Sequence, residues 1–369
     1  MPTKALCVIQ RLRNISSMIK NIDLRIRKVE SLSTPAQLAM QYPLSEKLAK
    51  KISEDRESVN NIIGGKDSRL LAIVGPCSIH DPVAALEYAQ KLNTLAKELK
   101  DQLFIVMRTY FEKPRTIGGW KGLILDPYLD GSYDIEAGIT AARKLLIDIT
   151  DLGLPVGCEM LDPIVPQYID ELLSWCSIGA RTTESQTHRT LASGMSVAVG
   201  FKNSTKGEYA TAVNAIKSAA SGGAFIGIDK EGNTSIYRTT GNDCGHLILR
   251  GGEFGPNYYE EDVEAAQIMM VKHNLNPAIV IDCSHANSRK DPKRQRRVLR
   301  AVIDQVIWGI SAIKGFMIES NLFEGCQTIE DNFETLKYGV SVTDGCIGWS
   351  ETEEVLRKAA DSLRKKEVV

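Results

Sequence analysis

The feature that most constrains the fold is a series of short apolar or β-branched runs separated by longer stretches with helical periodicity. Such runs predict strands that are buried on both faces of a parallel sheet, and the stretches between them predict crossover helices. Eight runs can be counted, at residues 70–77, 103–111, 155–160, 177–180, 197–202, 246–252, 278–285 and 315–320. About eight strands with intervening helices predict an α/β protein of the (β/α)₈ or TIM barrel class.

Two segments are additional to such a barrel. Apolar residues recur at helical spacing from Asp23 to about Asn61, with Pro35 and Pro43 marking turns. We therefore expect residues 1–69 to form a helical N-terminal extension that serves assembly or regulation, and residues 70–369 to form the catalytic barrel. Residues 224–229 and 233–241 predict an extra β-hairpin inserted before the sixth strand.

Charge and cysteine content exclude several classes of protein. The 45 Lys and Arg residues nearly cancel the 46 Asp and Glu residues, so no overall field favours nucleic acid or a membrane surface. Eight cysteines in a chain of 369 residues do not indicate a small disulfide scaffold, which favours a reducing compartment. No apolar stretch reaches the roughly 18 residues that a membrane span needs. We expect a soluble, cytoplasmic protein that binds neither nucleic acid nor membrane.

Four metal-competent side chains follow the predicted strands. Cys77 ends the first strand, His285 the seventh and Glu319 the eighth, and Asp344 lies in the loop that leaves the eighth. Each alone has an ordinary structural explanation, as a packed cysteine, a satisfied core histidine or a helix-capping carboxylate. Together, at the carboxyl end of one barrel, they favour a site for Mn²⁺, Fe²⁺, Co²⁺ or Zn²⁺ over Mg²⁺, which prefers oxygen ligands.

The other strand ends are cationic. This group comprises Arg108, Lys113, Arg115, Arg181, Lys202 and Arg250. Residues 113–115 alone are also compatible with a solvated run of charge. Cations that end apolar strands are expected to point into the barrel mouth, where they bind phosphate and carboxylate groups. Six of them exceed the need of one phosphate, so we expect two anionic substrates.

Several strings resemble one enzyme family. They include GPCSIHD (75–81), RTYFEKPRT (108–116), IGARTTESQTHR (178–189), DCSHAN (282–287) and ESNLFEGCQ (319–327). In this order they resemble the type I, class Iα, synthases of 3-deoxy-D-arabino-heptulosonate 7-phosphate (DAHP), over nearly the whole chain. The resemblance implies condensation of phosphoenolpyruvate with erythrose 4-phosphate and water, giving DAHP and phosphate, the first step of the shikimate pathway.

The resemblance also implies roles for individual residues. The implied ligands of a divalent metal ion are Cys77, His285, Glu319 and Asp344. Phosphoenolpyruvate is implied to bind Arg108, Lys113, Arg181, Lys202 and Arg250, with Glu159 nearby, and the phosphate of erythrose 4-phosphate to bind Arg115 and Thr116. For proton transfer we expect Lys113 to act at the aldehyde oxygen and His285 or Asp344 to act on water, while Lys202 stabilises the departing phosphate.

Regulated members of this family bind an aromatic amino acid between the barrel and the appended elements. The matching residues here are Asp23, Asp162, Pro166, Gln167, Met195, Ser196, Phe225 and Gly227. Gly227 is expected to leave room for a ring hydroxyl where phenylalanine-responsive relatives carry serine. We therefore expect feedback inhibition, with tyrosine favoured, in a homodimer or homotetramer.

Three other functions are compatible with parts of this pattern. A 3-deoxy-octulosonate 8-phosphate synthase uses the same phosphoenolpyruvate chemistry, although the KPRT string and the long N-terminal segment argue against it. A Schiff-base aldolase would use Lys202 as its nucleophile. A non-catalytic sensor of aromatic amino acids would keep the fold without the reaction, which the complete set of predicted ligands disfavours.

Overall fold

The structure, a computed structural model, describes residues 22–115, 117–329 and 335–366. The chain divides into two compact units, Met1–Ser33 and Thr34–Val369. Within the first unit, described residues 22–33 contain no helix, so the helix expected from Asp23 is wrong there. Among these described residues, Ile26 N–H donates to Asp23 O at 3.1 Å and closes a turn. A helix of this length is marginal in water without packing, which accounts for the difference.

Eight parallel strands of the second unit close into a barrel, which confirms the predicted fold class. The order around the barrel is β1-β10-β9-β8-β5-β4-β3-β2. The fourth strand begins at Trp175, two residues earlier than the sequence predicts, and most strands end before the last residues of the predicted runs. The strands are β1 (Leu70–Gly75), β2 (Leu103–Arg108), β3 (Val156–Met160), β4 (Trp175–Ile178), β5 (Ala198–Lys202), β8 (Gly245–Leu249), β9 (Ile279–Asp282) and β10 (Ile313–Glu319).

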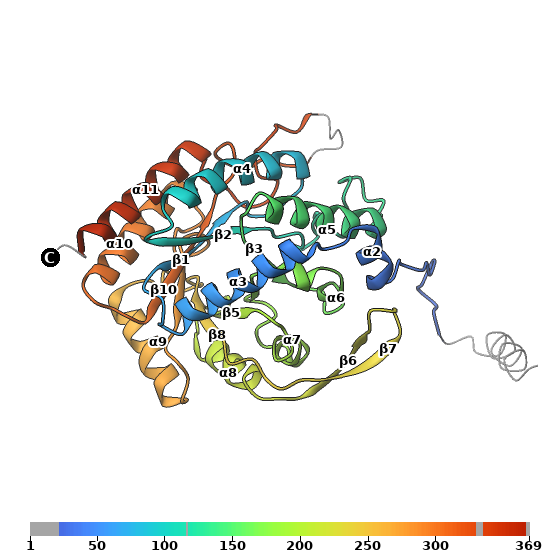
Figure 1. Cartoon of the computed structure of the whole chain (residues 1–369), viewed down its shortest axis with the longest axis horizontal. Helices are drawn as coiled ribbons and strands as arrows, with labels where there is room; N and C mark the ends of the chain where they lie inside the picture. Colours follow the sequence, from blue (N-terminus) through green and yellow to red (C-terminus); the bar gives the residue numbers. More distant parts are fainter. Residues whose placement is uncertain (1–21, 116, 330–334, 367–369) are drawn as a thin grey trace, which may run out of the picture. The chain divides into compact units, whose positions relative to one another are not determined.

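Helices surround this barrel (Figure 1). They are α2 (Pro35–Gln41), α3 (Glu46–Ile63), α4 (Pro82–Glu98), α5 (Ile135–Asp151), α6 (Pro166–Ile169), α7 (Gln186–Ala192), α8 (Ala210–Ala219), α9 (Glu260–Lys272), α10 (Gln295–Ile307) and α11 (Trp349–Lys366). Two 3₁₀ turns are η1 (Asp170–Leu172) and η2 (Pro292–Arg294). No described helix is long and apolar enough to cross a membrane.

Burial on both faces explains why the strands are continuously apolar. Along β1, Leu70, Ala72 and Val74 belong to the cluster between sheet and helices, whereas Leu71 and Ile73 belong to the cluster inside the barrel. Successive side chains of a strand point to opposite faces, so a strand inside a ring of helices has no solvent face.

The last turns of helix α3 pack against the side chains inside the barrel. Its residues Val59, Ile62 and Ile63 join the interior cluster, and α2 and α3 fall in the same compact unit as the barrel. Residues 34–69 therefore pack with the barrel, whereas the sequence pattern assigns them to the N-terminal extension. Their separate role in assembly or regulation stays a prediction.

The expected hairpin is present as β6 (Ala224–Ile228) and β7 (Thr234–Arg238), which pair antiparallel (Figure 1). Its turn reaches the start of α2, where Ala36 N–H donates to Lys230 O at 2.8 Å. On its inner face the rings of Phe225 and Tyr237 stack with centroids 5.1 Å apart. The hairpin thus packs through one face and one turn onto the barrel unit.

Candidate active site

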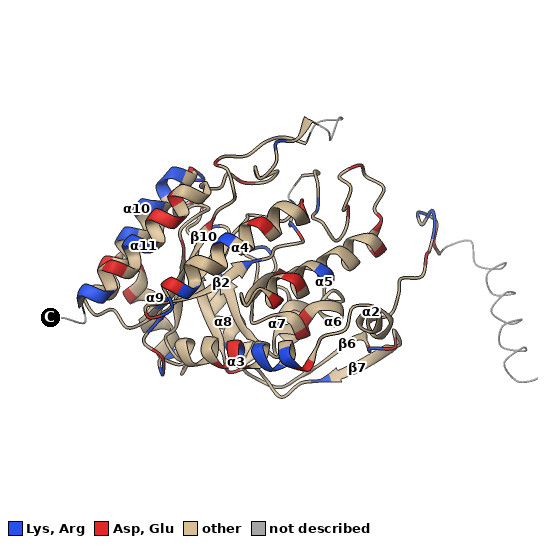
Figure 2. Ribbon diagram, turned by 45° about the horizontal axis from the view of Figure 1, so that its top comes forward, with Lys and Arg blue, Asp and Glu red and all other residues tan. Residues whose placement is uncertain are grey.

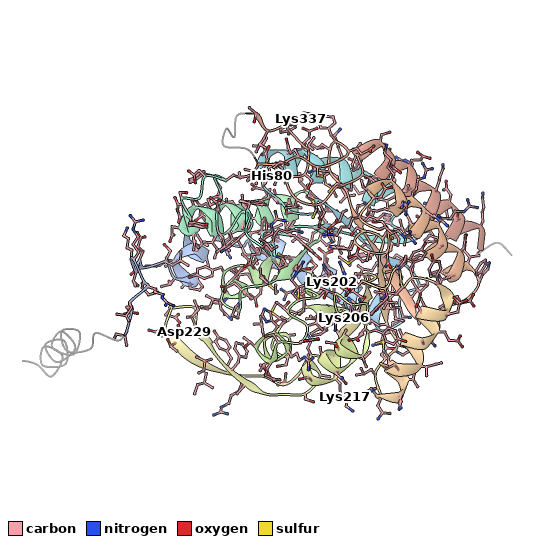
Figure 3. The ribbon with its side chains drawn as sticks, turned by 180° about the vertical axis from the view of Figure 1, so that it is seen from behind. His80, Lys202, Lys206, Lys217, Asp229 and Lys337 are labelled. Atoms are coloured by element: carbon pink, nitrogen blue, oxygen red, sulfur yellow. The ribbon has the colours of Figure 1, made fainter. Side chains whose placement is uncertain are left out.

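The carboxyl ends of the barrel strands surround a cavity of about 310 Å³. Such a mouth is where (β/α)₈ enzymes place their catalytic groups. Lys202, at the end of β5, lies toward the centre of the strands in Figure 3, and Lys206 lies on the loop that follows. Seven cations line the cavity together with Glu159, His285 and Asp344: Arg108, Lys113, Arg115, Arg181, Lys202, Arg250 and Lys290.

Three of the four predicted metal ligands lie together. One ligand atom each of Cys77, Glu319 and Asp344 lies within 4.8 Å of the other two. The Sγ of Cys77 is 3.9 Å from Oδ2 of Asp344. These residues come from the ends of β1 and β10 and from the loop before α11, so the barrel brings together residues distant in sequence.

His285 lies beside this group and is oriented toward it. Its Nε2 is 3.9 Å from Oε1 of Glu319, whereas its Nδ1 is 2.8 Å from both Oδ2 of Asp282 and Oγ of Ser284. An imidazole held by a carboxylate through Nδ1 presents Nε2 as its free ligand atom. The backbone of His285 is left-handed, with φ 50°. This conformation is uncommon for a residue with a side chain and tends to cluster at functional sites.

The charges of this group suit a bound cation. Burial, and then the nearby Glu319, raises the pKa of the Cys77 thiol to about 11, while Lys113 opposes the rise. The Nζ of Lys113 is 3.0 Å from the Sγ of Cys77. Burial alone would lower the pKa of Lys113, but Cys77 and Glu319 raise it above its ordinary value. With its pKa raised in this way, Cys77 is a neutral thiol near neutral pH, and a bound cation would favour its thiolate. With two carboxylates and an imidazole it would complete the donor set of a borderline divalent ion.

Arg108 is fully buried, and one nitrogen of its guanidinium group has no hydrogen-bond partner among the described residues. Its Nη2 donates to Oε1 of Glu319 at 3.1 Å, and its guanidinium carbon lies 4.0 Å from the centroid of the Tyr110 ring. Its Nη1 is buried without a hydrogen-bond partner among the described residues. A Cβ at Gly75, where φ is 151°, would lie 3.0 Å from Arg108 O, so glycine permits the close approach of β1 and β2. An unsatisfied buried donor in a cavity is suited to an anionic ligand.

Lys202 forms a buried ion pair with Glu159 on β3. Burial would raise the pKa of Glu159, but the adjacent Lys202 lowers it below its ordinary value. The adjacent ammonium group thus favours the ionised form of Glu159. Arg250 follows β8, and its backbone N–H donates to Oδ1 of Asn203 at 2.7 Å. Arg115 is held near the mouth by a hydrogen bond from its Nε to Trp120 O at 3.0 Å. Thr116, the second predicted contact for erythrose 4-phosphate, lies outside the described residues.

Sequence reasoning missed three residues of this region. Asp282 orients His285, and its place at the end of an apolar run was an available signal. Lys290 lines the cavity because residues 289 and 290 are left-handed, which the sequence does not reveal. Gln295 hydrogen-bonds the backbone of Glu319 from the start of α10, and only the fold brings these two residues together.

The predicted effector residues are brought together in part. Gln167 accepts a hydrogen bond from the Tyr237 hydroxyl at 3.2 Å, and Phe225 stacks on the same ring. A Cβ added to Gly227 would lie 3.2 Å from this ring, so the space expected beside Gly227 is occupied by Tyr237.

The other predicted effector residues lie around this cluster or outside the unit. Met195 is buried and Ser196 is exposed in the loop before β5, while Pro166 begins α6. Asp162 N–H donates to Oε1 of Glu112 at 3.2 Å. Asp23 belongs to the first compact unit, which is described by itself.

Fold and site together define a class, the (β/α)₈ barrel enzymes that bind anionic substrates beside a metal-competent group. The DAHP synthetase I family matches residues 42–357 of this chain. The chain belongs to that family.

Similar proteins and a solved structure support this family assignment. The chain is 50% identical over 341 residues to the Tyr-sensitive phospho-2-dehydro-3-deoxyheptonate aldolase of Escherichia coli K12, covering 92% of this chain and 96% of the relative. It is 49% identical to the Phe-sensitive enzyme of the same organism, covering 94% and 99%. A solved phospho-2-dehydro-3-deoxyheptonate aldolase from Francisella tularensis SCHU S4 superposes with a TM-score of 0.90 at 46% identity, covering 92% of this chain and 99% of that one. The predicted family and enzyme class are confirmed.

Proposed function

We propose that this protein condenses phosphoenolpyruvate with erythrose 4-phosphate and water to form DAHP and inorganic phosphate. The observation that carries the proposal is the barrel mouth, where Cys77, Glu319 and Asp344 meet beside a cavity lined by seven cations. Membership of the DAHP synthetase I family supports it. Two phosphorylated substrates account for a cationic excess that one phosphate would not require.

Phosphoenolpyruvate is proposed to bind at the inner end of the cavity. The free Nη1 of Arg108 and the ammonium of Lys202 lie there, and Arg181 and Arg250 also line the cavity. Glu159 limits the rotation of Lys202 through their buried ion pair. The phosphate of erythrose 4-phosphate would bind at the outer rim, at Arg115 and Thr116.

A divalent ion, Mn²⁺, Fe²⁺, Co²⁺ or Zn²⁺, is proposed to bind Cys77, His285, Glu319 and Asp344. When bound, it supplies Lewis-acid activation of the aldehyde of erythrose 4-phosphate. The mixed sulfur, nitrogen and oxygen donor set favours these ions over Mg²⁺. Asp282 orients the imidazole of His285 so that Nε2 faces Glu319.

The remaining steps fall to the chain's own side chains. As C3 of phosphoenolpyruvate bonds to the aldehyde carbon, Lys113 gives a proton to the aldehyde oxygen and positive charge develops at C2. Water adds at C2, and His285 or Asp344 accepts its proton. The C2–O bond to the phosphate of the resulting phosphohemiketal then breaks, while the proton of the C2 hydroxyl passes to the leaving phosphate and C2 becomes the ketone. Lys202 and the neighbouring arginines stabilise the charge of the released phosphate.

Regulation and assembly are proposed as the family resemblance implies them. An aromatic amino acid, with tyrosine favoured, would bind near Gln167, Phe225 and Gly227 and inhibit the enzyme. We propose a cytoplasmic homodimer or homotetramer.

The test is phosphate release from phosphoenolpyruvate with and without erythrose 4-phosphate. We expect turnover only with both substrates, loss of turnover with EDTA and recovery with Mn²⁺. Turnover with arabinose 5-phosphate in place of erythrose 4-phosphate would support the octulosonate synthase instead. Inactivation by borohydride in the presence of substrate would support a Schiff base at Lys202. If no turnover is seen after the metal is restored, the non-catalytic sensor of aromatic amino acids would remain as the hypothesis.

A further inference from the structure

A second cavity lies on the outside of the barrel, between α10 and α11. Its volume is about 780 Å³, and it shares no lining residue with the barrel mouth. Its floor is made of the apolar residues Leu299, Ile303, Val355 and Ala359. Its rims carry charge from α10 and α11, on both of which Figure 2 shows basic and acidic residues. The turn η2 before α10 adds Lys293 and Arg294. We call this cavity the α10–α11 groove.

The α10–α11 groove concentrates positive charge in a protein whose formal net charge is −1. Seven cationic side chains and two carboxylates, Asp304 and Asp361, line it, which leaves a formal charge of +5. The cations are Lys293, Arg294, Arg296, Arg297, Arg300, Lys358 and Lys365.

Three of the seven cations are paired with carboxylates outside the groove lining: Lys293 with Glu324, Arg294 with Asp291 and Lys358 with Glu354. The other four cations keep much of their charge available. Arg296 lies 3.7 Å or more from its acidic neighbours, and Arg300 lies 3.9 Å from Asp304. No ion pair joins Arg297 or Lys365 to any acidic group in the described part of the chain. Exposed pairs of this kind neutralise charge only weakly in water.

The cations also stand where helix electrostatics disfavour them. The first turn of α10 contains Arg296 and Arg297 and no acidic residue, and Lys293 and Arg294 precede it directly. The positive end of a helix dipole normally favours acidic side chains. Three of these four cations are partly compensated, since Lys293 lies 3.2 Å from Glu324, Arg294 3.4 Å from Asp291 and Arg296 3.7 Å from Glu354. Arg297 has no ion pair among the described residues, and the cationic excess at this helix end suits a ligand that supplies negative charge.

We propose that the α10–α11 groove binds an oligophosphate, a small molecule with two or more linked phosphate groups. Arginine forks and lysine ammonium groups on two facing helices match a chain of phosphates, and the volume lies in the range of small-molecule sites. Asp304, which lies 3.9 Å from Arg300, remains to accept hydrogen bonds from hydroxyl or amino groups attached to the phosphates, whereas Asp361 already accepts from Nη1 of Arg364 at 2.8 Å.

Two macromolecular occupants fit less well. An acidic amphipathic helix would need an apolar floor to cover, but Leu299, Ile303, Val355 and Ala359 are only 3–7% exposed. Such a helix would therefore bury little additional apolar surface. A single-stranded nucleic acid would use aromatic side chains for base stacking, and no aromatic residue lines the groove.

The test is calorimetric titration of the whole protein with inorganic tripolyphosphate at physiological ionic strength. The groove variant is Arg297→Gln/Lys365→Gln. One control, Lys47→Gln/Lys50→Gln, removes the same charge from exposed positions of α3. A second control, Arg181→Gln, reports binding at the barrel mouth. We expect wild type and both controls to retain a groove site, and the groove variant to lose at least about tenfold in affinity for it, because two charge-assisted contacts are removed.

Some results would overturn the proposal. Equal affinity of wild type and groove variant would place the tripolyphosphate elsewhere, and complete loss in Arg181→Gln would assign all binding to the barrel mouth. Equal affinity for sulfate would show general screening rather than an oligophosphate site, and tighter binding of a polyglutamate peptide would make the ligand an acidic protein segment. DAHP synthesis is not measured, so the result does not depend on the proposed reaction.

Discussion

The side-chain amide of Gln295 pairs with the backbone of Glu319 through two hydrogen bonds. Its Nε2 donates to Glu319 O and its Oε1 accepts from Glu319 N–H, both at 2.8 Å. Gln295 begins α10 and Glu319 ends β10, and both are buried. The pairing continues the strand's hydrogen bonding and fixes the backbone from which the Glu319 carboxylate reaches Cys77 and Asp344.

Replacing Gln295 with alanine should weaken metal binding. The loss of a group that orients a ligand typically lowers metal affinity by about 10–100-fold. The control is Gln305→Ala on the same helix, where a buried glutamine donates to Tyr258 O at 2.8 Å. Both variants should lose stability, about 1–3 kcal/mol for each buried group left unpaired. Only Gln295→Ala should lower Mn²⁺ affinity in a competition titration, and equal affinities would show that Gln295 is merely structural.

Cys77→Ala should remove metal and activity together. The thiol is fully buried, and its Sγ lies within reach of Glu319 and Asp344, whereas Cys176 on β4 is fully buried outside this group. Cys176→Ala should lose stability through its small cavity but keep the bound metal. Metal content by elemental analysis and phosphate release would be measured on both proteins. Full metal content in Cys77→Ala would contradict the assigned site.

Arg115→Ala and Arg181→Ala should each weaken the binding of a different substrate. Both residues line the barrel mouth, but Arg115 belongs to the rim, where its Nε is bound to Trp120 O. An arginine contact to phosphate contributes about 1.5–3 kcal/mol, so its loss should raise the relevant KM about ten- to a hundredfold. Arg115→Ala should raise the KM for erythrose 4-phosphate, and Arg181→Ala the KM for phosphoenolpyruvate. Equal effects on both substrates would refute the division.

The stability of the Glu112→Gln variant relative to that of the wild type should increase as the pH rises. Burial, and then the facing carboxylates of Asp162 and Glu159, raises the pKa of Glu112 to about 8. A carboxyl whose pKa is raised by folding favours the folded state below its unfolded pKa and loses that advantage as pH rises through the folded pKa. Glutamine cannot ionise, and its carbonyl can still accept from Asp162 N–H.

Melting temperatures of Glu112→Gln and wild type should therefore converge near pH 5 and separate toward pH 8, with the variant higher. The difference in unfolding free energy should reach the order of 3–4 kcal/mol over this range, as a shift of one pKa unit corresponds to about 1.4 kcal/mol. Parallel curves for the two proteins would show that Glu112 is ionised throughout.

The barrel and most residues of its mouth can be predicted from the sequence because both depend on local patterns. Continuous apolar runs such as residues 70–74 mark strands buried on both faces, and polar residues directly after them must lie at the same end. The fold therefore places Cys77, His285 and Glu319 at one mouth, as their positions after strands one, seven and eight predict.

Contacts between residues that are distant in the chain could not be predicted from the sequence. Gln295 and Glu319 are separated by a whole helix and strand, and no local pattern identifies a glutamine as the partner of a particular peptide group. The ring of Tyr237 against Gly227 depends on the register of the hairpin, in which Phe225 pairs with Tyr237 and Gly227 with Ser235. A shift of one residue would have turned that ring to the other face.

Tyrosine should inhibit the wild-type enzyme more strongly than phenylalanine or tryptophan, and the inner face of the hairpin should decide the preference. Tyr237 lies between Phe225, Gly227 and Gln167, to which its hydroxyl is bound at 3.2 Å. A Cβ at residue 227 would come within 3.2 Å of this ring, so Gly227→Ser should displace Tyr237 and narrow the adjoining space. We expect this variant to lose about fivefold in sensitivity to tyrosine, since a displaced aromatic contact is worth about 1 kcal/mol and tenfold corresponds to about 1.4 kcal/mol. Its preference should shift toward phenylalanine. Ile226→Ser, on the exposed outer face of the same strand, is the matched control and should keep the wild-type preference. Inhibition curves with all three amino acids would measure the effect, and a wild-type enzyme indifferent to tyrosine would refute the assignment.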